Sequence, residues 1–554
     1  MSDGADATTG TVANLVGRTL ARLGAGRCFG VVGSGNFHVT NALRAADVPF
    51  VATRHEAGAA TMADAYARMS GQVGLVSVHQ GCGLTNAATG ITEAAKSRTP
   101  VIVLAAESAA AAVGSNFAMD QPGFARSLGA VPERVHTPAS AVADTVRAFR
   151  TAQNGRRTVV LNLPLDVQAA PAPTEGPDVA PVLAPEPVRP RTEAVARLAE
   201  LFRQSERPVV LAGRGARGAG PELRALAERT GALLATSAVA NGLFAGDPFD
   251  LGISGGFASP VAAELISGAD LVVAFGCALN MWTTRHGRLL RAGTTLVQVD
   301  VEEAALGASR PVDLGVLGDV AATASAVLES LGVVRSPGYR LSDVADRLAR
   351  AGRWNDTPTP DLSTADRIDP RLLSRALDDL LPAERVVSID SGNFMGYPSA
   401  YWRVPDEYGF CFTQAFQSVG LGLATAIGAA LARPDRLPVL GTGDGGFLMA
   451  VADLETAVRL RLPLVCVVYN DAAYGAEVHH FGADEDLATV VFPDTDIAAI
   501  ARGFGATGLT VRSPADFAPV AGWLASAPTA PLVIDAKIAS DGGSWWLAEA
   551  FRGH

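Results

Sequence analysis

Lysine is scarce in this sequence: of its 45 basic residues, Lys96 and Lys537 are the lysines and the others are arginines. Schiff-base chemistry on a lysine therefore has few candidates. Acidic residues number 56, so the chain carries a net charge of −11. Such an excess of negative charge disfavours chain-wide attraction to nucleic acid or to an anionic membrane surface. We therefore expect neither nucleic acid nor a membrane as a partner.

Cysteine is also scarce, and the 5 cysteines lie far apart. The absence of any C-x-x-C pair argues against a disulfide framework and against a cysteine zinc site. Uninterrupted apolar runs stay shorter than the ~20 residues that a membrane-spanning helix needs. The start, Met1–Gly10, is polar and acidic rather than basic and then apolar. These absences predict a soluble protein of the cytoplasm.

Proline-rich and polar stretches divide the 554 residues into three parts. Residues 171–192 are rich in proline and have little apolar periodicity, which is typical of an extended linker. Residues 336–369 form a second polar stretch and a second predicted linker. We therefore predict an N-terminal domain at 1–170, a central domain at 193–335 and a C-terminal domain at 370–554.

Short apolar runs alternate with amphipathic helical segments in all three parts. Continuous apolar runs bounded by glycines are typical of parallel strands that helices cover on both faces. The sequence therefore predicts three α/β domains with doubly wound parallel sheets, of which the first and third are similar in layout. The predicted strands are Cys28–Val32, Phe50–Thr53, Leu75–His79, Val101–Ala105, Val209–Ala212, Ala232–Ala235, Leu271–Phe275, Leu296–Val299, Val386–Asp390, Val439–Thr442 and Leu464–Tyr469.

The loops after parallel strands are where ligands bind in such folds. One of them, Gly213–Gly218, has the spacing of the dinucleotide fingerprint G-x-G-x-x-G. That fingerprint also needs an acidic residue at the end of the next strand, and here this strand is followed by Thr236 and Ser237. A tight turn that packs a helix on the sheet is the favoured interpretation, and nicotinamide binding is the alternative.

A second glycine loop, Gly441–Gly446, contains Asp444. The helical segment Phe447–Arg461 and then the strand Leu464–Tyr469 follow, and that strand leads into Asn470. A right-handed crossover sets such strands side by side, so we expect Asp444 and Asn470 at the same sheet edge. A carboxylate and an amide oxygen suit Mg²⁺, which commonly takes further oxygens from phosphates. In the alternative interpretation, Asp444 only caps a helix.

Glu56 follows a predicted strand and begins a helical segment with an apolar side. From the residues alone it is either an ordinary acidic residue at a helix start or a catalytic carboxyl group.

Taken together, these features resemble the thiamine diphosphate-dependent decarboxylases and carboligases, a family that includes acetolactate synthase, benzoylformate decarboxylase and pyruvate oxidase. The resemblance covers almost the whole chain. Its most specific part is the G-D-G…N cofactor motif, found here at Gly443–Gly445 and Asn470. Arg54–Gly58 with Ala65–Arg68 resembles the family's H-E-x-x-A…G-Y-A-R segment, and Val419–Ala429 is similar to the stretch before the cofactor motif.

The resemblance implies two thiamine diphosphate-binding domains, a pyrimidine-binding one at the N-terminus and a diphosphate-binding one at the C-terminus, around a central Rossmann-like domain. It implies Mg²⁺ held by Asp444, Asn470 and the backbone carbonyl of Ala472. It makes Glu56 the residue that exchanges a proton with the cofactor's aminopyrimidine ring. The other cofactor-binding residues that it implies are Gly392, Asn393, Val419, Gly443, Gly445, Gly446, Tyr474 and Gly475.

The resemblance also suggests residues that meet the substrate. His79, Gln80 and Glu477 are candidates for catalysis, with a hydrogen-bonded loop residue as the alternative role for His79. The substrate-binding candidates are Ser34, His79, Gln121, His479 and His480. Surface positions are the alternative for the two last histidines.

The implied reaction is decarboxylation of a 2-oxo acid, with pyruvate as the default donor, followed by protonation of the enamine or its carboligation to an aldehyde or a second oxo acid. The alternatives are a flavin-linked oxidase of pyruvate-oxidase type and a non-catalytic, regulatory homologue. Acetolactate synthases carry arginine after the position of Gly276, where this chain has Cys277–Trp282, and this argues against bound FAD. The family further implies a homodimer as the minimal unit and a homotetramer as the assembly.

Overall fold

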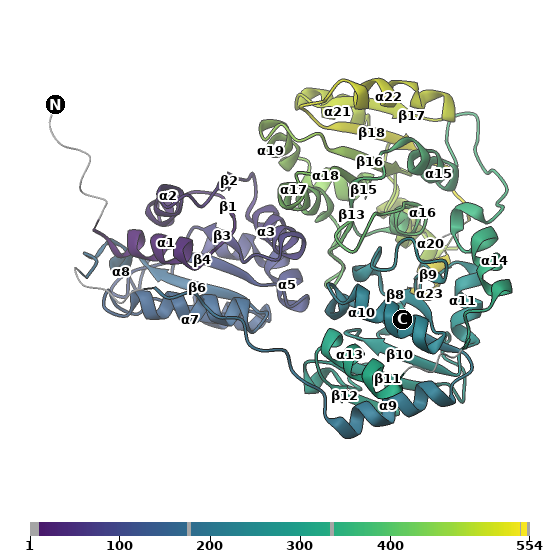
Figure 1. The fold of residues 1–554 in the computed structure, drawn as a ribbon. Helices are drawn as coiled ribbons and strands as arrows, with labels where there is room; N and C mark the ends of the chain where they lie inside the picture. The colour runs from purple at the N-terminus through teal and green to yellow at the C-terminus, as the bar shows by residue number, and fades with distance from the viewer. Residues whose placement is uncertain (1–9, 174–178, 333–336, 483, 543–544, 551–554) are drawn as a thin grey trace.

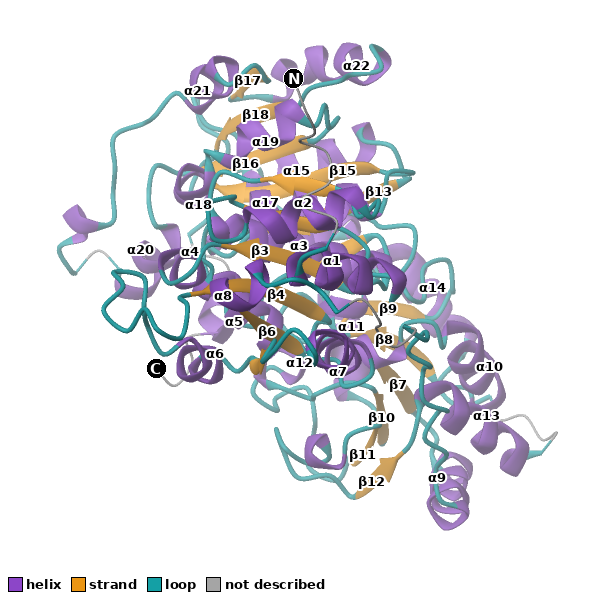
Figure 2. Cartoon of the chain, turned by 90° about the vertical axis from the view of Figure 1, so that its left-hand side faces the viewer, coloured by secondary structure: helices purple, strands orange, loops and turns teal. Residues whose placement is uncertain are grey.

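The computed structural model describes residues 10–173, 179–332, 337–482, 484–542 and 545–550 (Figure 1). It contains three six-stranded sheets, one in each third of the chain. All strand pairings within these sheets are parallel. Helices flank the strands of each sheet (Figure 2). The predicted α/β fold with three parallel sheets is confirmed.

The N-terminal sheet has the strand order β2-β1-β3-β4-β6-β5. Its central strands are buried along their whole length, as their continuous apolar sequences predict. The strands are β1 (Cys28–Gly30), β2 (Phe50–Ala52), β3 (Gly74–Val78), β4 (Val101–Glu107), β5 (Val131–Arg134) and β6 (Thr158–Pro164). The helices are α1 (Val12–Arg22), α2 (Phe37–Ala45), α3 (Glu56–Ser70), α4 (Cys82–Asn86), α5 (Ala88–Lys96), α6 (Gln121–Ser127), α7 (Ala141–Gln153) and α8 (Leu165–Ala169).

The central sheet has the order β12-β11-β10-β7-β8-β9. Numbered within the domain, this is the 3-2-1-4-5-6 order of the Rossmann fold, so the predicted Rossmann-like domain is confirmed. The strands are β7 (Pro208–Ala212), β8 (Leu233–Thr236), β9 (Asp250–Ile253), β10 (Leu271–Phe275), β11 (Thr295–Asp300) and β12 (Leu314–Leu317). The helices are α9 (Thr192–Gln204), α10 (Gly220–Thr230), α11 (Pro260–Ser267), α12 (Met281–Thr284), α13 (Val320–Leu331) and α14 (Ser342–Ala351), the last within the predicted linker 336–369.

The C-terminal sheet has the order β14-β13-β15-β16-β18-β17. The strands are β13 (Arg385–Ile389), β14 (Phe410–Phe412), β15 (Leu437–Gly443), β16 (Val465–Asn470), β17 (Thr507–Val511) and β18 (Leu532–Lys537). The helices are α15 (Pro370–Leu380), α16 (Gly396–Tyr401), α17 (Gly422–Ala432), α18 (Asp444–Ala450), α19 (Asp453–Arg459), α20 (Gly475–Phe481), α21 (Ile497–Gly503), α22 (Ala518–Ala525) and α23 (Trp545–Ala550). Counted within each domain, this order equals that of the N-terminal sheet, which explains the similar layout of the first and third parts.

One helix predicted from the sequence is two helices in the structure. The segment Phe447–Arg461 is interrupted at residues 451–452, between α18 and α19. The break sets Asp453 at the start of α19, where its Oδ1 accepts hydrogen bonds from the backbone N–H of Arg54 (3.0 Å) and from the Thr456 hydroxyl (3.0 Å). The prediction of one continuous helix was therefore wrong, and the first residue of the second helix contacts the N-terminal domain.

The N- and C-terminal domains of the chain share one hydrophobic core, in which α3 packs against α17 (Figure 1). Both helices are rich in alanine, so their backbones come close together. A Cβ atom at Gly428 would lie 2.3 Å from the carbonyl oxygen of Met62, so glycine is needed at this contact. The helix that begins with Glu56 is thereby fixed to the C-terminal domain of its own chain.

Within the described residues, no helix is long and apolar enough to cross a membrane.

Candidate cofactor site and active site

The predicted metal ligands Asp444 and Asn470 lie side by side. β15 pairs with β16 in a register that sets Gly443 opposite Tyr469, so the next residue of each strand emerges at the same edge. Asp444 is 8% exposed and Asn470 is 1% exposed. The prediction that one sheet edge brings an acid and an amide together is confirmed in its geometry.

Asp471 adds a second carboxyl group to this edge, and the sequence analysis missed it. Its side chain hydrogen-bonds to that of Asp444. Burial raises the pKa of Asp444 to about 6, and burial together with the charge of Asp444 raises the pKa of Asp471 to about 7. Its position directly after Asn470 was the signal that could have identified it.

The amide of Asn470 has a fixed orientation. Its Nδ2 donates to Oδ1 of Asp535 (2.8 Å), and its Oδ1 accepts the backbone N–H of Ala472 (3.1 Å). Asp535 is fully buried, and its other oxygen lies 3.0 Å from Nζ of Lys537, one of the two lysines. This buried pair fixes the amide so that its side-chain oxygen, Oδ1, lies on the side of Ala472.

Ala472 adopts a left-handed backbone conformation with φ 58°. Non-glycine residues rarely adopt it, and when they do it is often at functional sites. In the described part of the chain, no group of three or more His, Cys, Asp or Glu side chains could hold a metal ion. The Asp444 site instead offers carboxylate, amide and carbonyl oxygens, and no basic side chain of the described residues pairs with Asp444 or Asp471. A set of oxygen donors with uncompensated acidic charge fits Mg²⁺.

The predicted cofactor-binding glycines lie around the same loop. A Cβ atom at Gly445 would come within 2.7 Å of the Tyr474 ring, and one at Gly475 within 2.2 Å of Asp471 Oδ2. Gly443 faces Phe394, and Asn393 lies beside Gly475. These positions leave no room for larger side chains, and glycine lets a phosphate approach the backbone closely.

Val419 and Gly446 approach each other, since a Cβ atom at Gly446 would lie 3.3 Å from Val419 Cγ1. The fully buried Asp390 joins them: it accepts the backbone N–H of Gly420 (3.0 Å) and the Thr442 hydroxyl (3.0 Å). Burial raises the pKa of Asp390 to about 6, although the hydrogen bonds to its carboxyl group act in the opposite direction. The predicted diphosphate-binding set, including Gly392 before Asn393, therefore comes together in one place.

The C-terminal helix α23 packs against the residues that follow Gly392. Nε1 of Trp546 donates to the backbone carbonyl of Asn393 (2.9 Å), and its indole ring meets Tyr397 edge-on. Trp545 stacks on Trp354 and lies under the guanidinium of Arg285 from the central domain. The C-terminal helix thus holds the loop that begins with Gly392.

In the N-terminal domain, Glu56 is buried at the first turn of α3. Its Oε2 accepts a hydrogen bond from Nδ2 of Asn86 (3.1 Å), and its Oε1 lies near Gly83. The carboxyl group therefore lies beside the loop after β3, which also holds His79 and Gln80.

Ser34 and His79 lie together at the carboxyl edge of the N-terminal sheet. Nε2 of His79 is 3.4 Å from Oγ of Ser34, and Nδ1 is 3.1 Å from the carbonyl of Gln80. A carbonyl oxygen only accepts, so Nδ1 carries the proton in the neutral ring and Nε2 faces Ser34 as an acceptor. Phe117 packs edge-on against the ring.

The two predicted glutamines of this region differ. Oε1 of Gln80 is buried and has no hydrogen-bond partner among the described residues. Gln121 has all its polar atoms in use: Oε1 accepts the N–H of Gly81 (3.0 Å), and Nε2 donates to Ala106 O (3.1 Å) and Asn162 Oδ1 (2.8 Å). In this conformation Gln121 holds the glycine loop after His79.

Glu477, His479 and His480 lie on α20, next to the Asp471–Gly475 loop. Glu477 and His479 are partly exposed and His480 is exposed. Among the described residues, no hydrogen bond or ion pair joins Glu56, Ser34 or His79 to α20 or to the Asp444 loop of the same chain. Within one chain, the described hydrogen bonds and ion pairs therefore do not connect the two halves of the predicted active site.

The central domain contributes a cavity of about 490 Å³ where the three domains meet. Gly213, Arg214 and Gly215 line it, and Gly215 packs against Gly276. This close packing agrees with the favoured interpretation of that glycine loop as a tight turn. Burial and the charges of Arg68, Arg217 and Arg156 lower the pKa of Arg214 to about 10. Basic side chains outnumber acidic ones in the lining of this cavity.

Family models match all three domains. A thiamine pyrophosphate enzyme N-terminal TPP binding domain matches residues 10–126, a thiamine pyrophosphate enzyme central domain matches 195–327, and a thiamine pyrophosphate enzyme C-terminal TPP binding domain matches 390–536.

Curated relatives agree with these matches. A probable 2-ketoarginine decarboxylase of Pseudomonas aeruginosa is 32% identical over 90% of this chain and 88% of its own length. A sulfoacetaldehyde acetyltransferase of Castellaniella defragrans is 29% identical over 90% and 88%, and an acetolactate synthase large subunit of Parasynechococcus marenigrum is 28% identical over 89% and 82%.

The fold and the site together define an enzyme that uses thiamine diphosphate. This chain belongs to the thiamine pyrophosphate enzyme family, whose members similar to it include decarboxylases and acyltransferases.

Proposed function

We propose that this chain decarboxylates a 2-oxo acid with thiamine diphosphate and Mg²⁺. The remaining fragment would then be protonated, or it would be joined to an aldehyde or to a second 2-oxo acid. Pyruvate is the default donor by analogy with the family. The observation that carries the proposal is the convergence of Asp444, Asn470 and the left-handed Ala472 at one sheet edge. This donor set, with the glycines around it, fits a divalent ion and a diphosphate.

The residues of the C-terminal domain would bind and orient. Asp444, Asn470 and the carbonyl of Ala472 would hold Mg²⁺, while the N–H groups of Gly445 and Gly446 would meet the diphosphate. Bound thiamine diphosphate supplies an electron-accepting ring that allows a 2-oxo acid to lose CO₂. Val419 would support this ring system from the loop before α17.

The residues of the N-terminal domain would hold and move protons. Glu56 would exchange a proton with a ring nitrogen of the cofactor, and Asn86 keeps its carboxyl group in place. His79 would donate or accept a proton at Nε2, next to the hydroxyl of Ser34, which would bind the substrate carboxylate. Glu477 would act from α20 on the side of the diphosphate loop.

Two copies of the chain would build each complete site, in a homodimer at minimum. In one chain, no hydrogen bond or ion pair between described residues connects Glu56 with the Asp444 loop, and this supports the arrangement. Apolar side chains are also exposed at the carboxyl edges of both outer sheets: Phe37 is 51%, Met449 58% and Val419 40% exposed. Burial of such side chains against a second copy would remove them from water.

The test is to incubate the protein, thiamine diphosphate and Mg²⁺ with a panel of 2-oxo acids that includes pyruvate and 2-ketoarginine, and to measure CO₂ release. Products are then identified with and without added aldehydes, sulfoacetaldehyde among them. We expect CO₂ from at least one acid, only when both cofactors are present. Release from none, by protein that binds the cofactor, would instead support a non-catalytic homologue.

Glu56→Gln is the matching variant. It keeps the size of the side chain, so the fold and the affinity for thiamine diphosphate should change little, while exchange of the cofactor's C2 proton should slow by about 100-fold or more. Exchange at the wild-type rate would remove Glu56 from the reaction.

A flavin-linked oxidase is the second candidate, and the positively charged central cavity with its glycine loop favours it. Purified protein would then be yellow from a bound flavin, and colourless active protein would exclude it.

A further inference from the structure

The loop that carries Val419 belongs to the C-terminal domain and is also held by the N-terminal domain. We call residues 413–421, between β14 and α17, the Val419 loop. Its far end is anchored within the C-terminal domain, where the N–H of Gly420 donates to Asp390. Among the described residues, 417–419 have no hydrogen bond to any other element, so the two ends of the loop set the position of Val419.

The near end of the loop is anchored by the other domain. Oε1 of Glu93 accepts the backbone N–H of Ala415 (3.0 Å), and Oε2 accepts that of Phe416 (2.6 Å). Glu93 lies on α5 of the N-terminal domain, more than 300 positions earlier in the chain. Hydrogen bonds to an ionised carboxylate are about twice as strong as those between neutral groups.

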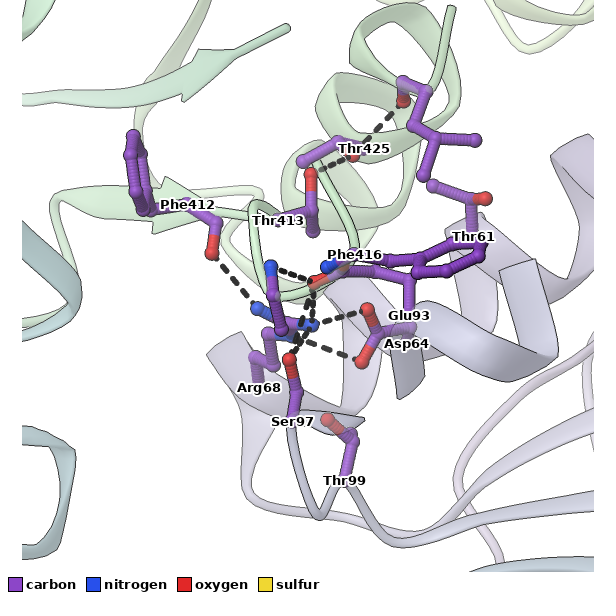
Figure 3. Close-up of polar contacts among 12 residues, drawn as sticks. Thr61, Asp64, Arg68, Glu93, Ser97, Thr99, Phe412, Thr413, Phe416 and Thr425 are labelled. Carbon is purple, nitrogen blue, oxygen red and sulfur yellow. Dashed lines mark hydrogen bonds and ion pairs between the residues drawn. The ribbon is translucent and has the colours of Figure 1, made fainter. Parts of the chain in front are cut away.

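Glu93 is held in turn by Arg68 (Figure 3). Nη2 of Arg68 donates to Glu93 Oε1 (2.8 Å) and to Asp64 (2.6 Å), and Nη1 donates to the backbone carbonyl of Phe412 (2.8 Å). The Ser97 hydroxyl also donates to Glu93 Oε1 (3.1 Å). Arg68 therefore bridges the carboxylate that holds the loop and the strand end from which the loop departs.

The ionised state of Glu93 follows from these contacts. Its side chain is fully buried, and burial alone would raise the pKa of the carboxyl group. The charge of Arg68 and the N–H groups of Ala415 and Phe416 outweigh burial, so the pKa lies below its ordinary value. A buried carboxylate with this many donors holds them in one geometry, because leaving any of them unpaired is unfavourable.

Helix α3 links this anchor to the predicted active site. Glu56 is its first residue and Arg68 lies in its last turn. One rigid element therefore carries the carboxyl group predicted to act on the cofactor and the guanidinium that fixes the Val419 loop.

We propose that Glu93 is a positioning residue for the cofactor: supported by Arg68, it sets the Val419 loop from the N-terminal domain, and thereby the place of Val419 under the cofactor. This inference rests on the proposed function, because it assumes that Val419 meets thiamine diphosphate.

The test measures the dissociation constant for thiamine diphosphate with saturating Mg²⁺, by titration of the full-length protein, for Glu93→Gln, Val419→Ala and the double variant. Glutamine keeps the shape but turns an N–H₂ group toward backbone donors. We expect Glu93→Gln to raise the dissociation constant about tenfold. If Glu93 acts through Val419, the double variant should bind no more weakly than the weaker single variant.

Asp378→Asn is the matched control. Asp378 is also fully buried and paired with arginine, at Arg385 and Arg403, but it does not touch the Val419 loop. It should lower the thermal midpoint by a similar amount and leave the dissociation constant at the wild-type value. Glu93→Asp is the milder variant should Glu93→Gln fail to fold: it keeps the charge, cannot reach both N–H groups, and should weaken binding about threefold.

Three results would overturn the inference. One is wild-type affinity in the Glu93 variants, and another is a double variant whose loss equals the product of the two single losses. The third is equal weakening by Asp378→Asn, since the effect would then come from lost stability. A wild-type protein that binds no thiamine diphosphate would refute the proposed function itself, so the two failures are distinguishable.

Discussion

Asp535 fixes the orientation of the Asn470 amide at the predicted metal site. The Asp535 carboxylate accepts a hydrogen bond from Nδ2 of Asn470, and Lys537 balances the charge of this buried carboxylate. If the amide turned over, two acceptor oxygens would face each other. This arrangement makes Asp535 a supporting residue for the predicted metal site.

We predict that Asp535→Asn weakens Mg²⁺ binding by about tenfold or more, since supporting residues typically contribute that much to metal affinity. Titration calorimetry with Mg²⁺ in the presence of thiamine diphosphate measures this directly. Asp496→Asn, at an exposed helix start, is the control and should bind Mg²⁺ normally. Wild-type affinity in Asp535→Asn would show that the orientation of Asn470 does not depend on it.

The raised pKa values of Asp444 and Asp471 predict how the site responds to pH. Both folded-state values lie above that of an ordinary aspartate, so without metal the protonated pair contributes stability at low pH. This contribution declines once the pH exceeds the pKa of an ordinary aspartate, about 4, and it is fully lost as the pH rises through about 6 to about 7. Mg²⁺ needs the ionised form, so the affinity for Mg²⁺ should rise over the same interval.

Thermal unfolding with and without Mg²⁺ and thiamine diphosphate, at pH 5.5 and pH 8, measures this pH dependence. The midpoint should rise more on adding Mg²⁺ at pH 8. Asp471→Asn removes the second acid, which should shift the pH dependence to lower pH. An equal Mg²⁺ effect at both pH values would contradict the assignment of the pair to the metal site.

Among the described elements, α3 and α17 form the most extensive helix contact between the domains, and it depends on small residues. In an ordinary helix, Gly→Ala stabilises by about 0.5–1 kcal/mol. At Gly428 we predict the opposite, a destabilisation of about 1–3 kcal/mol, because the added methyl group would collide with the backbone of Met62.

Chemical denaturation of Gly428→Ala measures this change, with Gly522→Ala as the matched control. Gly522 also lies in a helix, α22, and nothing surrounds its missing Cβ within 4 Å. The control should be slightly stabilised. Stabilisation of both variants would mean that α3 and α17 are packed less closely than the structure has them.

The elements also show what the sequence could predict. Buried strands such as β10 were predicted from continuous apolar runs, and Asp444 was predicted beside Asn470 because their strands follow each other along the chain. The contact of Asn470 with Asp535 was not predictable in this way. It depends on β18 pairing with β16, across 65 residues and with β17 outside it.

Two further residues, Asp471 and Glu93, differ in how far the sequence could have predicted their roles. Asp471 is adjacent to a recognised ligand, so a closer reading of the loop could have included it. Glu93 gave no signal, because a glutamate on an amphipathic helix looks like a solvated residue until a distant loop is placed over it. Long-range contacts of this kind follow from tertiary packing and not from local pattern.

For the whole molecule, we predict that active sites are shared between two chains. Glu56→Gln and Asp444→Ala should each be inactive alone, but mixed dimers would contain one site with neither change. After unfolding and refolding together in equal amounts, half of the dimers would be mixed, so about one quarter of the wild-type activity should return. No recovery, with dimers present by analytical ultracentrifugation, would show that each chain builds its own site.

The two outer domains have the same strand order. Helices α3 and α17 follow equivalent strands, β2 and β14, which are the second strand of each domain in chain order and lie at the edge of each sheet. Their contact inside one polypeptide therefore joins equivalent helices of two domains that have the same strand order. Each of these domains has its own carboxyl edge, where its predicted cofactor residues lie. When two polypeptides pair through these edges, we expect the four related domains to form a closed ring. A change at the α3–α17 contact of either chain would then affect both of the new interfaces between the chains.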